Sequence, residues 1–124
     1  RVAVFGDMLE LGGSSQAEHE KLGRMCDPNL LSWVVVVGVA ATQYLAPAAR
    51  STGCQVHVAR NAIEAGEFVR SIIEPGTVVL VKGSQNEIFL EECVKVLCDM
   101  TEDAELVRQS DKWLAIKDKY FQQF

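Results

Sequence analysis

Four short runs of β-branched residues, separated by segments with helical spacing, constrain the fold of this chain more than any other feature. The second and fourth runs are almost continuous valine, a pattern typical of strands covered on both faces, as in a parallel sheet. Alternation of strands with helices at this spacing indicates βαβ units with right-handed crossovers. The predicted strands are residues 2–5 (VAVF), 33–38 (WVVVVG), 55–59 (QVHVA) and 77–83 (TVVLVKG).

Between these runs, apolar residues recur at the spacing of one helical face. We therefore expect an α/β fold: a Rossmann-like, mostly parallel sheet of four strands in the order 3-2-1-4, flanked by helices. Three helices are predicted to begin at a capping residue that Glu follows three positions later, at residues 15–18, 61–64 and 84–87. The predicted apolar faces are Leu22, Met25 and Cys26 in the first helix, Tyr44, Leu45 and Ala48 in the second, Phe68, Val69 and Ile72 in the third, and Leu90, Val94, Leu97 and Cys98 in the fourth.

Residues 101–124 have a different pattern, and we expect them to form a helical extension packed on a domain of residues 1–100. Thr101 followed by two acids predicts a short helix, and residues 110–111 predict the start of a last helix. One stripe of this last helix carries large apolar side chains, which leaves two interpretations open. The stripe packs against the domain, or it is a docking surface for another domain or subunit. Its residues are Trp113, Ile116, Tyr120 and Phe124.

The composition is that of an ordinary globular domain and argues against several classes of function. Apolar residues make up 48% of the 124-residue chain and charged residues 23%. The net charge of -5 argues against a nucleic-acid partner, because the phosphate backbone requires a basic face. No apolar stretch approaches the roughly 18 residues of a transmembrane helix, and no signal peptide pattern is present. We therefore expect a cytoplasmic protein without a membrane span.

The cysteines and histidines do not have the spacing of a metal site, so no metal ligand is predicted. No two of the four cysteines form a C-x-x-C pair. All four are expected to be buried, reduced thiols of a cytosolic protein. His19 and His57 are expected to be structural. The cysteines are Cys26, Cys54, Cys93 and Cys98.

Ligands of doubly wound sheets bind beyond the carboxyl ends of the strands, where the strand order reverses. For the order 3-2-1-4, the loops that meet there are VFGDMLELGGSS and VKGSQNE. Asp7 and Glu10 provide carboxylates, while Lys82 and the amides of a helix capped by Ser84 favour an anion. This arrangement fits a zwitterion, such as an amino acid or a small peptide. The alternative is structural: Asp7 caps a turn, Glu10 is solvated and Lys82 extends along the surface.

Two other classes of protein lack their motifs here. The chain has neither G-x-x-x-x-G-K-[ST] nor G-x-G-x-x-G, so no nucleoside triphosphate site is predicted in it. A receiver-like signalling domain needs an Asp after the third strand, where this sequence has Ala59, Arg60 and Asn61.

The segments AVFGDMLELGGSSQAEHEKLG, VVVVG and VLVKGS followed by FLEECVKVL resemble the C-terminal domain of the Mur ligases, over residues 1–100. The combination of G-D-M-x-E-L-G, H-x-x-x-G, and V-K-G-S with E-E on the next helix is distinctive. Within the family, the resemblance is greatest to the ligases that add D-alanyl-D-alanine to UDP-N-acetylmuramoyl-tripeptide in peptidoglycan synthesis. The chain starts at Arg1 inside an apolar run, without an initiator Met, so we expect it to be part of a longer enzyme.

This resemblance implies an enzyme of three domains, of which this chain is the last. An N-terminal domain holds the UDP-sugar, and a central domain carries the P-loop and binds ATP and Mg²⁺. The C-terminal domain closes over the ATP site and helps to position the dipeptide, whose amine attacks an acyl phosphate made from the tripeptide's terminal carboxylate. The implied catalytic residues lie upstream, so the isolated domain is expected to be inactive and to bind no cofactor alone.

The resemblance also assigns roles to residues of this chain. The G-D-M-x-E-L-G loop would face the central domain and the dipeptide. His19 matches the recurring histidine of the family's first helix and would have a structural role or support the residues that contact the substrate. Gln85 stands where the family usually has Arg, which leaves open how the dipeptide carboxylate is held. For residues 101–124 the resemblance implies nothing. The predicted substrate-binding residues are Asp7, Met8, Glu10, Leu11, Lys82, Gly83, Ser84 and Gln85.

Two alternatives remain open from the sequence. One is a stand-alone Rossmann-like module that binds a small ligand. The other is a Mur-like ligase for a different amino acid or peptide, which the difference at Gln85 allows.

Overall fold

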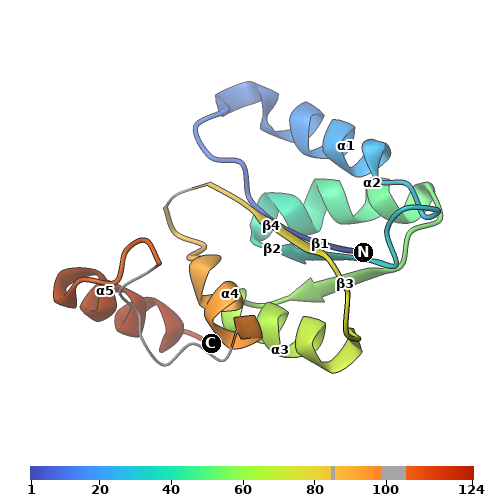
Figure 1. The fold of residues 1–124 in the computed structure, drawn as a ribbon. Helices are drawn as coiled ribbons and strands as arrows, with labels where there is room; N and C mark the ends of the chain where they lie inside the picture. The colour runs from blue at the N-terminus through green and yellow to red at the C-terminus, as the bar shows by residue number, and fades with distance from the viewer. Residues whose placement is uncertain (85, 99–105) are drawn as a thin grey trace.

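The computed structural model describes residues 1–84, 86–98 and 106–124. It contains a four-stranded parallel sheet in the order β3-β2-β1-β4 (Figure 1), which confirms the predicted fold class and strand order. At the centre of the sheet, Val4 pairs with Val35 on one side and with Val81 on the other. The strands are β1 (Val2–Gly6), β2 (Trp33–Val37), β3 (Val56–Ala59) and β4 (Val79–Lys82). The helices are α1 (Ser15–Met25), α2 (Ala46–Ser51), α3 (Ala62–Ile72), α4 (Glu91–Cys98) and α5 (Asp111–Phe121), with a short 3₁₀ turn η1 (Gly12–Ser14) and a π-helical turn η2 (Ala41–Leu45).

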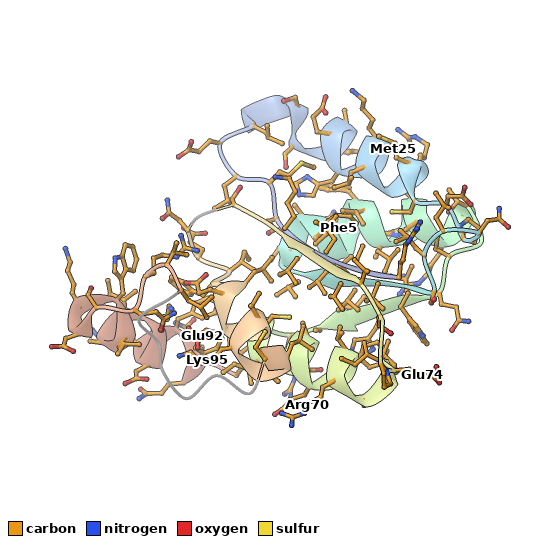
Figure 2. The ribbon with its side chains drawn as sticks, viewed as in Figure 1. Phe5, Met25, Arg70, Glu74, Glu92 and Lys95 are labelled. Carbon is orange, nitrogen blue, oxygen red and sulfur yellow. The ribbon has the colours of Figure 1, made fainter. Side chains whose placement is uncertain are left out.

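Helices α1 and α2 lie on one face of the sheet, and α3 and α4 lie on the other (Figure 1). Each face has its own apolar core, because successive side chains of a strand point to opposite faces. Val4 and Val35 belong to the core beneath α3 and α4. Phe5 and Val36 belong to the core beneath α1 and α2 (Figure 2).

Two apolar residues predicted to lie inside the protein, one in the fourth strand and one in the first helix, are exposed instead. The valines of β2 are buried on both faces as expected, but Leu80 of β4 is 53% exposed. β4 is an edge strand, and on that face α2 and η2 contact β2 and β3 instead. Met25 at the end of α1 is 71% exposed and points away from the core (Figure 2). Its helix turns a different stripe inward, which contains the buried His19 and Gly23.

Close helix packing depends on two glycines. A Cβ at Gly23 of α1 would lie 2.5 Å from the carbonyl oxygen of Leu45, so α1 and the helix beside it touch through backbone. A Cβ at Gly66 of α3 would lie 2.8 Å from Cβ of Val96 in α4. Such approaches leave no space for a side chain at either position.

The three predicted helix starts have different outcomes. Asn61 caps α3 as expected, because its side-chain oxygen accepts a hydrogen bond from the Glu64 amide at 2.9 Å. Helix α1 begins at Ser15, with Ser14 as the cap and no side-chain capping bond. The prediction at residues 84–87 is wrong, since α4 begins only at Glu91. Glu87 and Phe89 have φ of 73° and 51°, a left-handed conformation that interrupts a helix.

Helix α5 lies beside α4, on the side of the carboxyl ends of the strands (Figure 1). The Phe89 ring lies 5.2 Å from the Tyr120 ring and 6.4 Å from the Trp113 ring, measured between centroids. Lys117 of α5 is buried and forms an ion pair with Glu92 of α4. The short helix predicted at Thr101 lies outside the described residues.

The four cysteines are free thiols, and three of them are buried. Burial raises the pKa of Cys93 to about 12, which keeps that thiol protonated at neutral pH. Burial, with a contribution from Cys54, raises the pKa of Cys26 to about 11. Cys98 is exposed, so the expectations that it is buried and lies on the inner face of its helix are wrong.

Candidate functional site

A cleft of about 630 Å³ opens beyond the carboxyl ends of β1, β2 and β3. This is the edge of a parallel sheet at which ligands bind in doubly wound folds. Its walls come from the loops after β1, β2, β3 and β4 and from the end of α5. The residues that matter most for its chemistry are Asp7, Val39, Arg60, Glu87, Tyr120 and Phe124.

Asp7 has both a structural role and a place in the cleft wall. It is 8% exposed, and its Oδ1 accepts a hydrogen bond of 2.7 Å from the Ala41 amide at the start of η2. Its carboxyl group packs on Gly38, where a Cβ would lie 2.5 Å from the carboxyl carbon and where φ is +111°. Gly38 therefore satisfies two constraints, a left-handed backbone and a close approach of the carboxylate. Asp7 ties the loop after β1 to the helix after β2.

His19 supports the same loop from behind. It is fully buried, and its Nε2 accepts a hydrogen bond of 3.0 Å from the Met8 amide. The proton must then reside on Nδ1, which donates to the carbonyl oxygen of Ser15 at 2.7 Å. Both ring nitrogens are used inside the protein, so His19 positions the backbone of the loop.

Ser84 joins the loops after β1 and β4. Its Oγ accepts a hydrogen bond of 2.7 Å from the Leu9 amide, and its own amide donates to the carbonyl oxygen of Asp7 at 3.1 Å. The helix expected to begin at Ser84 is not found, since α4 begins at Glu91, so no helix amides stand beside Ser84. The role of Ser84 in substrate binding stays a prediction. A small hollow of about 210 Å³ lies against this junction and includes the exposed Glu10, whose φ is 63°.

Lys82 and Asp7 do not share a cleft. The exposed Lys82 lines a separate hollow of about 300 Å³, together with Arg108 and Glu91. Gly83 lines this hollow and the hollow beside Ser84, and a Cβ there would be 2.8 Å from Leu90 Cδ1. Lys82 and Asp7 thus line different hollows of this domain, and their expected roles in substrate binding stay predictions.

The other predicted site residues lie in the loop after β1 or outside the described residues. Met8 and Leu11 are half-buried in that loop. Gln85 lies outside the described residues, and its role in substrate binding stays a prediction.

Sequence reasoning did not identify Arg60 and Glu87 as site residues, and it placed Tyr120 and Phe124 only in an apolar stripe that either packs on the domain or docks another domain or subunit. Arg60 follows β3 directly and forms an ion pair of 2.6 Å with Glu64. Burial, and then the negative charges of Asp7 and Glu87, raise the pKa of Tyr120. A charged residue directly after a strand was a usable signal for Arg60, whereas nothing local indicated that Tyr120 would reach the strand ends.

The described ranges contain no cluster of three or more His, Cys, Asp or Glu side chains able to hold a metal ion. Within the same ranges, no helix has the length and apolar character needed to cross a membrane.

Comparison with known proteins agrees with this architecture. The sequence profile of the family described as Mur ligase, glutamate ligase domain, matches residues 1–85. A UDP-N-acetylmuramoyl-tripeptide–D-alanyl-D-alanine ligase of Mycobacterium leprae is 34% identical over 88 residues, which are 68% of this chain and 17% of the relative. Two crystal structures of MurF from Acinetobacter baumannii cover 80% and 81% of this chain, at 27% and 28% identity and TM-scores of 0.62 and 0.60.

This chain covers 22% of each MurF chain, so it spans about a fifth of the length of these relatives. The match includes the loop after β1 and, as far as residue 85, the start of the loop after β4. Ser84 joins these two loops. Since the matched residues make up more than half of the chain and the predicted strand order is observed, the chain belongs to the Mur ligase family, as its C-terminal glutamate ligase domain.

Proposed function

We propose that this domain is the C-terminal part of an ATP-dependent ligase that adds D-alanyl-D-alanine to UDP-N-acetylmuramoyl-tripeptide in peptidoglycan synthesis. The observation that carries the proposal is the agreement of two comparisons on one substrate class. The curated relative is named for this reaction, and the similar solved structures are of MurF.

In this proposal, the domain positions the dipeptide and excludes water from the reacting groups, which are both recognised contributions to catalysis. The loop after β1 is well built for such a task, because His19 and Ser84 accept hydrogen bonds from its Met8 and Leu9 amides. The side chain of Asp7 also ties the loop to the Ala41 amide. A loop held in this way presents its remaining groups in one arrangement, and this reduces the ordering required when a ligand binds.

ATP and Mg²⁺ would be held by the upstream central domain, and the tripeptide nucleotide by the N-terminal domain. The present chain has no phosphate-binding motif of the G-x-x-x-x-G-K-[ST] type, and no metal-ligating cluster occurs in its described portion. When bound, ATP supplies the phosphoryl group that activates the tripeptide carboxylate. The residues of this chain would act on the amine substrate.

A second candidate is a ligase of the same family that uses a different amino acid or peptide. Gln85 and Asn86 stand where the resemblance leads us to expect Arg after the serine, and this removes one cation from the loop. A stand-alone ligand-binding module is less favoured, because the chain spans only about a fifth of its relatives.

The test is ADP release by the full-length protein that contains this chain, with UDP-N-acetylmuramoyl-tripeptide and a panel of amines. We expect D-alanyl-D-alanine to give the highest kcat/KM, and the 124-residue domain alone to release no ADP above background. Preference for another amine would support the second candidate. Absence of ADP release with every amine would overturn both.

A further inference from the structure

Helix α5 forms a wall of the candidate cleft, although it lies outside the residues that match the family. The family match ends at residue 85, whereas α5 covers Asp111–Phe121. Tyr120 and Phe124 nevertheless line the same cleft as Asp7 and Arg60. The extension therefore contributes to the edge of the sheet at which a ligand is expected.

A buried set of charges determines where α5 lies. Nζ of Lys117 lies 2.6 Å from Oε1 of Glu92 and 3.0 Å from Oε1 of Glu91. Arg108 donates two hydrogen bonds to Glu91, at 2.8 and 2.6 Å. Buried charges need partners at close range and with good geometry. This requirement restricts how α5 can sit on α4, and so it restricts the position of Tyr120 one turn further on.

The Phe89 ring connects this arrangement to the loop after β4. Phe89 is buried, and its ring contacts Tyr120 at 5.2 Å and Phe121 at 6.4 Å between centroids. Glu87 of the same loop lines the cleft together with Tyr120. The loop after β4 and α5 thus place the Glu87 carboxylate and the Tyr120 ring in the same cleft.

The Tyr120 hydroxyl lies in an electronegative part of the cleft. No described residue forms a hydrogen bond with it. Burial has the largest effect on the pKa of Tyr120 and raises it. The negative charges of Asp7 and Glu87 raise it further. A protonated phenol can donate to a carboxylate and accept from a cation at the same time. The surroundings of the Tyr120 hydroxyl therefore suit an ammonium group.

The remainder of the cleft fits the body of a small peptide. Val39 and Phe124 present exposed apolar surface at 78% and 49% of their areas. Arg60 provides a cation, although it shares its charge with Glu64. The cleft is therefore complementary to a zwitterion with small side chains. It has carboxylates at one place, a guanidinium at another and apolar groups beside them.

We propose that Tyr120 is a specificity-determining residue for the amine substrate, whose ammonium it holds together with the carboxylates of Asp7 and Glu87. Lys117 is then a positioning residue, which acts through the placement of α5. This inference rests on the proposed function, because it names the part of the domain that receives the amine. It adds a role for residues that the family match does not include.

The experiment is steady-state kinetics of the full-length enzyme with D-alanyl-D-alanine as the varied substrate. Tyr120→Phe removes the hydroxyl and keeps the ring on Phe89. Tyr44→Phe is the matched control, because Tyr44 is the only other tyrosine of the chain and does not line the cleft. We expect Tyr120→Phe to raise the dipeptide KM about 10-fold, while kcat and the KM for ATP stay within about two-fold. A purely structural role of Tyr120 would not raise the dipeptide KM while leaving kcat and the KM for ATP unchanged.

Glu87→Gln replaces Tyr120→Phe as the deciding variant if the latter lowers the melting temperature, since Glu87 is exposed and the substitution keeps its size. A dipeptide KM that is unchanged, or that rises equally in Tyr44→Phe, overturns the inference and leaves the proposed function in place. A larger effect on the KM for ATP also overturns it. A wild-type enzyme that ligates no amine overturns the proposed function and this inference with it.

Discussion

Nζ of Lys117 lies 2.6 Å from Oε1 of Glu92, and both residues are buried at the contact between α5 and α4. Glu91 and Arg108 complete the same cluster, with Lys95 3.2 Å from Glu92 (Figure 2). Because these charges are buried together, the attachment of α5 to the domain depends on the whole set.

We expect Lys117→Met to destabilise the 124-residue domain by about 3–5 kcal/mol, because it leaves buried carboxylates without a main partner. Urea denaturation measures the free energy of unfolding. Lys112→Met is the matched control, since Lys112 is exposed on the same helix and should change stability by less than about 0.5 kcal/mol. Equal effects of the two substitutions would show that the buried ion pair does not hold α5.

Stability should depend on pH through Glu91. Burial by itself would raise the pKa of Glu91, but hydrogen bonds from Arg108, from its own amide and from Lys117 outweigh burial and hold that pKa below its usual range. A carboxylate with a lowered pKa in the folded state contributes stability above its unfolded pKa and loses it as pH falls through the folded pKa. The difference in unfolding free energy between wild type and Glu91→Gln should therefore be largest above about pH 5 and shrink below about pH 4.5.

Urea denaturation between pH 3 and 7 tests this expectation. Glu67→Gln serves as the control, because Glu67 is exposed on α3. A difference for Glu91→Gln that stays constant across the range would contradict the expectation.

Gly23→Ala should destabilise the protein by about 1–3 kcal/mol, although alanine normally favours a helix by about 1 kcal/mol over glycine. The added methyl group would lie 2.5 Å from the Leu45 carbonyl oxygen and 2.6 Å from Ala48 Cβ, so α1 would have to move away from α2. Gly13→Ala is the comparison, since nothing lies within 4 Å of its added Cβ. Thermal unfolding should separate the two variants, and equal melting temperatures would exclude close helix packing at Gly23.

Ser84→Ala should cost about 1–3 kcal/mol, because it leaves the part-buried Leu9 amide without its acceptor at 2.7 Å. Lys82→Ala should change stability by less than about 0.5 kcal/mol, since Lys82 is exposed at the end of β4. Amide hydrogen exchange offers a sharper measurement: the Leu9 amide should exchange faster in Ser84→Ala and not in Lys82→Ala. Unchanged exchange at Leu9 in both variants would contradict the role of Ser84.

Local patterns in the sequence predicted the four strands and the cap at Asn61, which follow from side-chain periodicity and from short-range hydrogen bonds such as the one between Asn61 and the Glu64 amide. The expected strand order came from the doubly wound fold class, and the structure confirms it. The same reasoning failed at residues 84–87, where the local signal was equally good. There, burial of Ile88, Phe89 and Leu90 and the bond from Leu9 to Ser84 stabilise a non-helical loop.

The sequence by itself therefore determined which segments form strands and which residues occupy the loops that follow them, because these features depend on residues close together in the chain. Only the tertiary structure decided which side chains share the cleft. Asp7, Arg60, Glu87 and Tyr120 come from four distant segments, and their meeting depends on buried contacts such as Lys117 with Glu92. The sequence does not show that these two residues form a pair, because they are 25 residues apart and no periodic pattern connects them. They pair only because packing removes both charges from water, and a buried charge needs a partner.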